Sequence, residues 1–435
     1  MMMELDDPQL CLMLLRACEG MKKLNYCWRT IEPRILRGLG AVMDSSTVNA
    51  LRRICVADGP GFGDFQAMLA SLPVTQCGGL GISLASDTSK FAYIASNLSS
   101  LEMQQKIFSS LPLVPTEVVS SLLESFEANA SMDAVQSSDL QNQVKLPHKL
   151  QNYMARIYYA KKRQDLFQHN YLTDMPEDLR NRTHAVLQSV LEPIASQWLF
   201  ALPNAGLSQH MNSNEFRAVI SIRLLIPLFD KSYTCRAKGC KDCVMDKFGY
   251  HALSCRGAGN LCKARHDIVR DALYDIALQG NFNPVKDAPV QCMGLDTSSL
   301  RGSHLFRPAD LLIRGNDFDR DCVDVTVSSP ISKDMCLPEH FIVGASALQA
   351  EDAKCRKHLL PCEEKGYGFH PFALDIFGVI GPQSTDLLKR LCHSYQAAKG
   401  ISKPLAFSIC FRRISFSVQL GVARQLLPLL IFLPD

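Results

Sequence analysis

Two short runs around residue 320 constrain the fold of this chain more than any other part of its sequence. Residues 311–313 are apolar and follow Asp310, and residues 322–327 alternate apolar and polar side chains around Asp324. The segment 315–319 between them has the composition of a turn. The pattern predicts two consecutive β-strands that each carry a carboxylate. Two acids on neighbouring strands converge at one edge of a sheet, where they can hold a divalent metal for phosphodiester hydrolysis.

Composition indicates a globular protein with several cores. The chain has 435 residues, of which 47% are hydrophobic and 20% are charged, and this length favours about two to four domains. The 46 basic and 43 acidic residues nearly cancel, so a nucleic-acid surface would be a local patch. The first residues are acidic and the longest apolar run, 426–433, is short for a bilayer span, so we expect no export signal and no membrane partner.

Apolar spacing divides the chain into four predicted parts. They are a helical region at 1–130, a helical connector at 131–230 that begins with a polar linker, a cysteine-rich segment at 231–260 and an α/β domain at 261–435. In the last part, the order helix, three strands, helix, strand and two helices favours a compact α/β domain. Those elements are expected at 268–277, 289–293, 310–314, 321–327, 345–360, 372–377, 381–397 and 405–427.

Five of the 17 cysteines fall between residues 235 and 262. Without an export signal, reduced thiols or metal ligands are favoured over disulfides. Cys240, Cys243, His251 and Cys255 have the ligand types of a structural zinc site, and Cys235 could replace Cys240. The segment has too few apolar residues to fold without a metal. The alternative is a chance spacing in a cysteine-rich chain.

The acids at 310 and 324 would hold Mg²⁺, and a lysine would help to stabilise charge on a phosphate. The restriction-endonuclease pattern places that lysine two residues after the second acid, where this chain has Thr326. A predicted helix at 345–360 offers Lys354, our first choice, and Lys357 on the same face as Glu351. The alternative is an ordinary charged helix surface. Arg265 and His266 open the preceding helix and could contact phosphate.

Taken together, these residues resemble the C-terminal half of non-LTR retrotransposon polyproteins that carry a restriction-like endonuclease. In that family a reverse transcriptase precedes a Cys-Cys-His-Cys knuckle, an Arg-His helix and a Pro-Asp…Asp nuclease core. This sequence matches the family at residues 240–255, at 265–266, at 307–310 and at 324–326, and it matches the two-lysine helix at 354–357. Residues 1–130 look similar to the region that follows the polymerase palm, which is the thumb.

The resemblance implies an α+β chain made of a helical thumb-like region, a small zinc segment and a restriction-endonuclease-like α/β domain. It implies a Mg²⁺-dependent endonuclease that nicks target DNA, with structural zinc, catalytic magnesium, and Arg307 beside Arg265 and His266 as nucleic-acid contacts. Partners would be DNA and element RNA, with no small-molecule cofactor, and the expected location is the nucleus.

The sequence also departs from the family. It lacks an aromatic-x-Asp-Asp strand, so we expect a truncated element without a palm and without reverse transcriptase activity. The acid expected on the first nuclease strand is at best Asp287. These departures leave two alternatives open, which are a non-catalytic zinc-containing nucleic-acid-binding module and a retrotransposon relic without a selected function.

Overall fold

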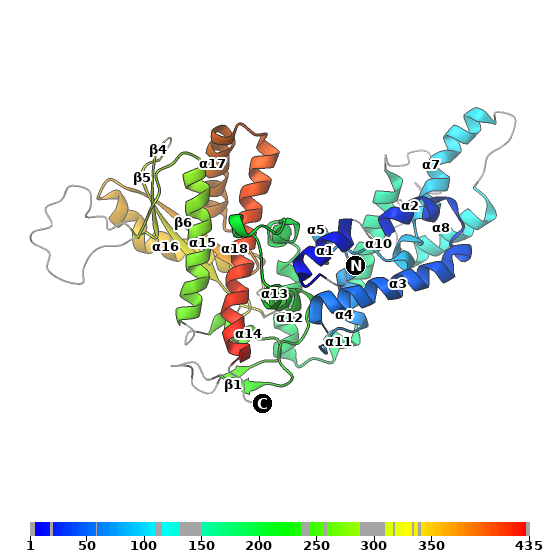
Figure 1. Cartoon of the computed structure of the whole chain (residues 1–435), viewed down its shortest axis with the longest axis horizontal. Coiled ribbons are helices and arrows are strands. Elements are labelled where there is room, and N and C mark those ends of the chain that lie inside the picture. The colour runs from blue at the N-terminus through cyan, green and yellow to red at the C-terminus, as the bar shows by residue number, and fades with distance from the viewer. Residues whose placement is uncertain are drawn as a thin grey trace, which may run out of the picture. The chain divides into compact units, whose positions relative to one another are not determined.

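The computed structural model describes residues 5–17, 21–57, 59–108, 115–130, 149–235, 240, 243–255, 259–287, 309–315, 318–332, 335–337 and 341–431. The chain forms two compact units, Met1–Met175 and Pro176–Asp435. Helices predominate and small sheets accompany them (Figure 1), so the α+β fold class is confirmed at this coarse level. The predicted linker after residue 130 lies outside the described residues.

In its described residues, the first unit consists of helices and loops. A buried ion pair between Lys162 and Asp87, with Nζ 2.7 Å from Oδ2, ties two of these helices together. Trp28 packs against Gly40, where an added Cβ would lie 3.2 Å from the indole ring. The helices are α1 (Pro8–Ala17), α2 (Met21–Thr30), α3 (Pro33–Val56), α4 (Asp64–Ser71), α5 (Val74–Cys77), α6 (Ala85–Thr88), α7 (Ala92–Ile107), α8 (Glu117–Ala130), α10 (Leu150–Leu166) and α11 (Asn170–Thr173).

The second unit begins with helices and a small ribbon. These elements are α12 (Glu177–Ser189), η2 (Ile194–Phe200), η3 (Ala205–Leu207), α13 (Ser213–Leu224), β1 (Tyr233–Thr234), β2 (Val244–Met245) and α14 (Tyr250–Ser254). Asn212 caps α13, because its Oδ1 accepts from the Glu215 amide at 2.9 Å while Glu215 Oε2 accepts from the Asn212 amide at 2.9 Å. This reciprocal pair satisfies two amides at the helix start.

A four-stranded sheet forms the centre of the second unit. Its strand order is β3-β4-β5-β6, with antiparallel pairs except for the parallel pair β5 and β6. The chain passes from β5 to β6 through α16, as a parallel pair requires. The elements are α15 (Gly259–Gln279), β3 (Val285–Lys286), β4 (Leu311–Gly315), β5 (Phe318–Ser328), α16 (Ala345–Glu363), β6 (Gly368–Asp375), α17 (Pro382–Lys399) and α18 (Lys403–Ile431). The strand predicted at 289–293 lies outside the described residues.

Helix α18 is the core helix of this unit. It runs beside α15 (Figure 1) and also packs against α13, α17 and η2. At Gly421 an added Cβ would lie 2.8 Å from Arg265 Cγ, so the absence of a side chain allows the close approach. By length and composition Lys403–Pro428 could cross a membrane, but most of its apolar window is buried inside the unit, as expected of a core helix.

Candidate functional site

The structure brings the two predicted acids together at one edge of the sheet. Asp310 stands immediately before β4, and its amide donates to Val323 O at 3.0 Å. This places it beside Asp324 on β5, where each carboxyl influences the pKa of the other. The Val325 amide donates to Asp310 Oδ2 at 2.7 Å and fixes that carboxylate.

His266 on α15 is the principal partner of Asp310. Its Nε2 lies 3.0 Å from Asp310 Oδ2, and its Nδ1 lies 3.3 Å from Asp267 Oδ1. Burial lowers the pKa of His266, but the two carboxylates outweigh burial and the net pKa is raised. Burial raises the pKa of Asp310, but the His266 contact outweighs it and the net pKa is lowered. The pair therefore favours imidazolium and carboxylate.

Asp324 has a different environment. It is only 7% exposed, and burial, with the charge of Asp310 adding to it, raises its pKa to about 6 although Lys354 acts in the opposite direction. Lys354 Nζ lies 2.8 Å from Asp324 Oδ2, and His358 Nε2 lies 3.7 Å from the same oxygen. Lys354 and His358 are four residues apart on α16 and so share a face. Lys357 is exposed, and among the described residues no ion pair joins it to either acid.

The cleft that Asp310, Asp324, His266 and Lys354 line has a volume of about 640 Å³. Asp287 follows β3 at its rim, and the Asp287 amide donates to Asp310 O at 3.0 Å. The Asp287 side chain is mostly exposed, and Arg270 Nη1 lies 3.4 Å from its Oδ2. Thr326 also lines the cleft, and its buried Oγ1 has no hydrogen-bond partner in the described part of the chain.

The predicted nucleic-acid contacts fall in different places. Arg265 is only 4% exposed and donates to Gln425 Oε1 at 2.6 Å and to Val327 O at 3.0 Å. This burial argues against a phosphate contact, and the guanidinium instead donates to acceptors inside the protein. His266 faces Asp310, and Arg307 lies outside the described residues.

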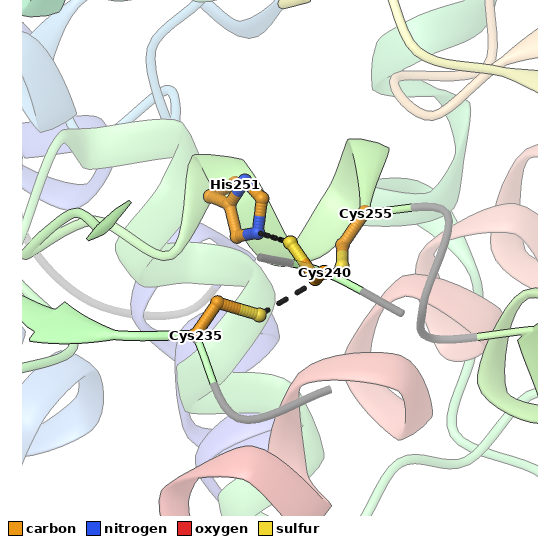
Figure 2. A group of neighbouring side chains, drawn as sticks. All are labelled: Cys235, Cys240, His251 and Cys255. Atoms are coloured by element: carbon orange, nitrogen blue, oxygen red, sulfur yellow. Dashed lines mark hydrogen bonds between the residues drawn. The ribbon is translucent and has the colours of Figure 1, made fainter. Parts of the chain in front are cut away.

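A second site lies in the cysteine-rich segment (Figure 2). Cys235, Cys240, His251 and Cys255 place their ligand atoms within 4.8 Å of one another. Tetrahedral zinc with Zn–S bonds of about 2.3 Å holds two sulfurs about 3.8 Å apart. The Cys235 and Cys255 sulfurs are separated by 3.8 Å, and Cys240 Sγ lies 3.3 Å from His251 Nε2. The cluster can therefore hold a metal such as zinc.

This cluster differs from the predicted ligand set at one position. Cys243 is exposed and lies outside the group of four, whereas Cys235 is buried and belongs to it. The Cys235 amide donates to Cys243 O at 2.7 Å, which places the two residues side by side just beyond the end of the β1–β2 ribbon. Burial and hydrogen bonds with Cys243, Cys255 and Cys235 raise the pKa of Cys240. A bound cation would favour the thiolate form.

Asp246 orders the turn before α14, the helix that carries His251. Its Oδ1 accepts from the Phe248 amide at 3.0 Å and the Tyr250 amide at 3.2 Å, and its Oδ2 accepts from the His251 amide at 3.0 Å. Arg182 Nη1 lies 3.8 Å from the same Oδ2. The carboxylate therefore fixes the start of α14, and with it the backbone of one metal-ligand candidate.

Sequence reasoning missed two of these residues. His358 could have been found from its position four residues after Lys354, which places both side chains on one helix face. Asp246 carried no such signal, because an acid before a short helix is common. No protein-family model matches this chain, and no curated protein matches it.

Proposed function

We propose that this chain is a Mg²⁺-dependent DNA endonuclease of the restriction-like kind found in non-LTR retrotransposons, and that it nicks DNA. The observation that carries the proposal is the pairing of Asp310 and Asp324 in one cleft, where Lys354 Nζ forms an ion pair with Asp324. Such chemistry needs two carboxylates on neighbouring strands to hold the metal and a positively charged side chain beside them.

The donor set of the cleft fits a hard divalent cation. Asp310 and Asp324 offer the oxygen ligands that Mg²⁺ prefers. The contacts of His266 and Val325 with Asp310, and of Lys354 with Asp324, all use an Oδ2 oxygen. The Oδ1 oxygens would remain for the ion. Bound Mg²⁺ would polarise the scissile phosphate and activate a water molecule.

The other residues of the cleft have separate roles in this proposal. His266 and the Val325 amide orient Asp310 by holding one of its oxygens. The Lys354 side chain is 31% exposed, so its ammonium can also face a phosphate in the cleft and offset negative charge there. The order α15, β3, β4, β5, α16 and β6 in the described part of the second unit supports a restriction-like domain. The zinc segment would help to grip the DNA.

A plasmid-nicking assay with Mg²⁺ tests the proposal. Asp310→Asn and Asp324→Asn should each slow nicking at least about 100-fold. Asp321→Asn is the matched control, because Asp321 lies on the same strand and Asp321 Oδ1 is 3.2 Å from His370 Nε2 instead of in the cleft. Nicking by Asp310→Asn at the rate of the unaltered chain would contradict the proposal.

A second candidate function is nucleic-acid binding without cleavage. His266 and Lys354 offset the charges of the two acids without a metal, and Thr326 stands where the restriction-like pattern has lysine. DNA binding that weakens steeply with salt, together with no nicking in Mg²⁺, would favour this candidate. Mg²⁺-dependent nicking that requires Asp310 would exclude it.

A further inference from the structure

A buried bridge of two side chains joins the cysteine–histidine cluster to the cleft. It consists of Arg265 on α15 and Gln425 on α18, and both side chains are buried. Gln425 Oε1 accepts from Arg265 Nη1 at 2.6 Å, and Gln425 Nε2 donates to Ala252 O at 2.8 Å. Ala252 follows the ligand candidate His251 in α14. One end of the bridge is thus attached to α14, the helix that carries His251.

The other end of the bridge reaches the cleft. Arg265 Nη2 donates to Val327 O at 3.0 Å, and Val327 lies three residues after Asp324 on β5. The next residue along α15 is His266, which holds Asp310. Helix α18 presses on Arg265 at Gly421, where an added Cβ would lie 2.8 Å from Cγ. The guanidinium therefore has little freedom to move while both of its ends are attached.

We propose that Arg265 and Gln425 are positioning residues that make the geometry of the cleft depend on metal in the cysteine–histidine cluster. Metal bound by His251 and Cys255 fixes α14, so Ala252 O stays within reach of Gln425. Gln425 then fixes Arg265, which holds β5 at Val327. Loss of the metal leaves α14 held by Asp246 at its start and, through the bridge, loosens the strand that carries the second acid. Only the identity of the ion in the cleft rests on the proposed nuclease function.

Isosteric variants of the full, zinc-loaded chain test the bridge. Gln425→Glu keeps the acceptor for Arg265 but removes the donor for Ala252 O. Gln419→Glu is the matched control, because Gln419 is also a buried residue of α18 and its Nε2 donates to Ile376 O at 3.1 Å, away from α14. Hydrogen exchange of residues 322–328 is the readout, since the Val325 amide is bonded to Asp310.

We expect exchange to rise at least about 5-fold in Gln425→Glu, the lower end of typical couplings between sites, and to stay unchanged in Gln419→Glu. Chelation of zinc from the unaltered chain should give the same rise. Equal exchange in the two zinc-loaded variants would overturn the proposal, even if the zinc-free chain unfolds. If Gln425→Glu does not fold, Arg265→Lys takes its place in the experiment. A single ammonium group cannot reach both Gln425 and Val327 O, so this variant also breaks the bridge. Unchanged exchange of residues 322–328 in Arg265→Lys would again overturn the proposal.

Mn²⁺ affinity separates this inference from the proposed function. In the zinc-loaded chain, Gln425→Glu should bind Mn²⁺ at least about 5-fold more weakly than Gln419→Glu. Mn²⁺ binding that requires Asp324 but is equal in the two glutamine variants would contradict the bridge alone. Mn²⁺ binding that is absent, or unaffected by Asp324→Asn, would contradict the proposed nuclease site, and hydrogen exchange would then decide on the bridge.

Discussion

Replacement of Glu351 by glutamine tests how α16 is attached to α17. Glu351 is fully buried on α16 and caps the start of α17 from outside that helix. Its Oε1 accepts from the Ser384 amide at 2.8 Å and from Ser384 Oγ at 2.5 Å, and its Oε2 accepts from the Gln383 amide at 3.3 Å. A Cβ at Gly381 would lie 2.2 Å from Oε1, so any side chain there would displace the Glu351 carboxylate.

The expected cost follows from these contacts. Glutamine keeps the shape but presents an NH₂ group to one of the donors, and a buried donor without an acceptor costs roughly 1–3 kcal/mol. Loss of negative charge at the helix N-terminus costs about 0.3–2 kcal/mol more. Easier burial of an uncharged group acts in the opposite direction. We expect Glu351→Gln to lower the free energy of unfolding of the second unit by about 2–4 kcal/mol.

Urea unfolding followed by tryptophan fluorescence measures this change. Trp198 lies in η2 of the second unit, so a Trp28→Phe background restricts the signal to that unit. Asp352→Asn is the control, because the neighbouring Asp352 is exposed and its replacement should change the free energy by less than about 0.5 kcal/mol. If Glu351→Gln unfolds at the same urea concentration as the background, the carboxylate charge contributes nothing and the reasoning is refuted.

Three further predictions concern other parts of the chain. Cys235→Ser should lose tightly bound zinc and Cys243→Ser should retain about one ion per chain; equal zinc contents by atomic absorption would contradict the ligand set. Gly421→Ala should lower the free energy of unfolding in urea by about 1–3 kcal/mol, because the added Cβ would meet α15. The control Gly38→Ala, in open space on α3, should be neutral or stabilising. Equal effects of the two substitutions would contradict the close approach of α18 to α15. Burial raises the pKa of Asp375 from 3.8 to about 7. The folded state therefore binds that proton more tightly, and the free energy of unfolding should fall by about 4 kcal/mol as the pH rises from about 4 to above 7. Asp375→Asn should remove this component of the pH dependence in urea unfolding, and an unchanged pH profile would contradict it.

The sequence predicted helices better than it predicted contacts. The segment expected as a helix at 345–360 is α16 (Ala345–Glu363), and the strand expected at 321–327 is β5 (Phe318–Ser328). Periodicity is local, so it places such elements to within a few residues. The start of α13 shows the limit, because Asn212 and Ser213 can each cap a helix and in the structure the Asn212 side chain accepts the hydrogen bond. Two neighbouring polar residues compete for that position, and local pattern does not rank them.

The candidate site shows why pairing across the sequence was harder to predict. Asp310 and Asp324 were expected to meet because a short turn joins their strands. The contact of His266 with Asp310 spans 44 residues, and no local pattern encodes it. The place of Cys235 in the metal cluster likewise depends on a contact with Cys255 that spans 20 residues. Local pattern along the chain does not encode such a contact either.

The place of helix α18 in the sequence, after the elements it packs against, affects how the second unit folds during synthesis. It packs against α13, α15, α17 and η2, yet it follows all of them in the sequence. During synthesis these elements leave the ribosome before the helix that covers their apolar faces. The unit therefore cannot close its core until residues 403–431 have emerged, and until then its nascent intermediates expose apolar surface. We expect the second unit to depend on chaperones while it is being synthesised.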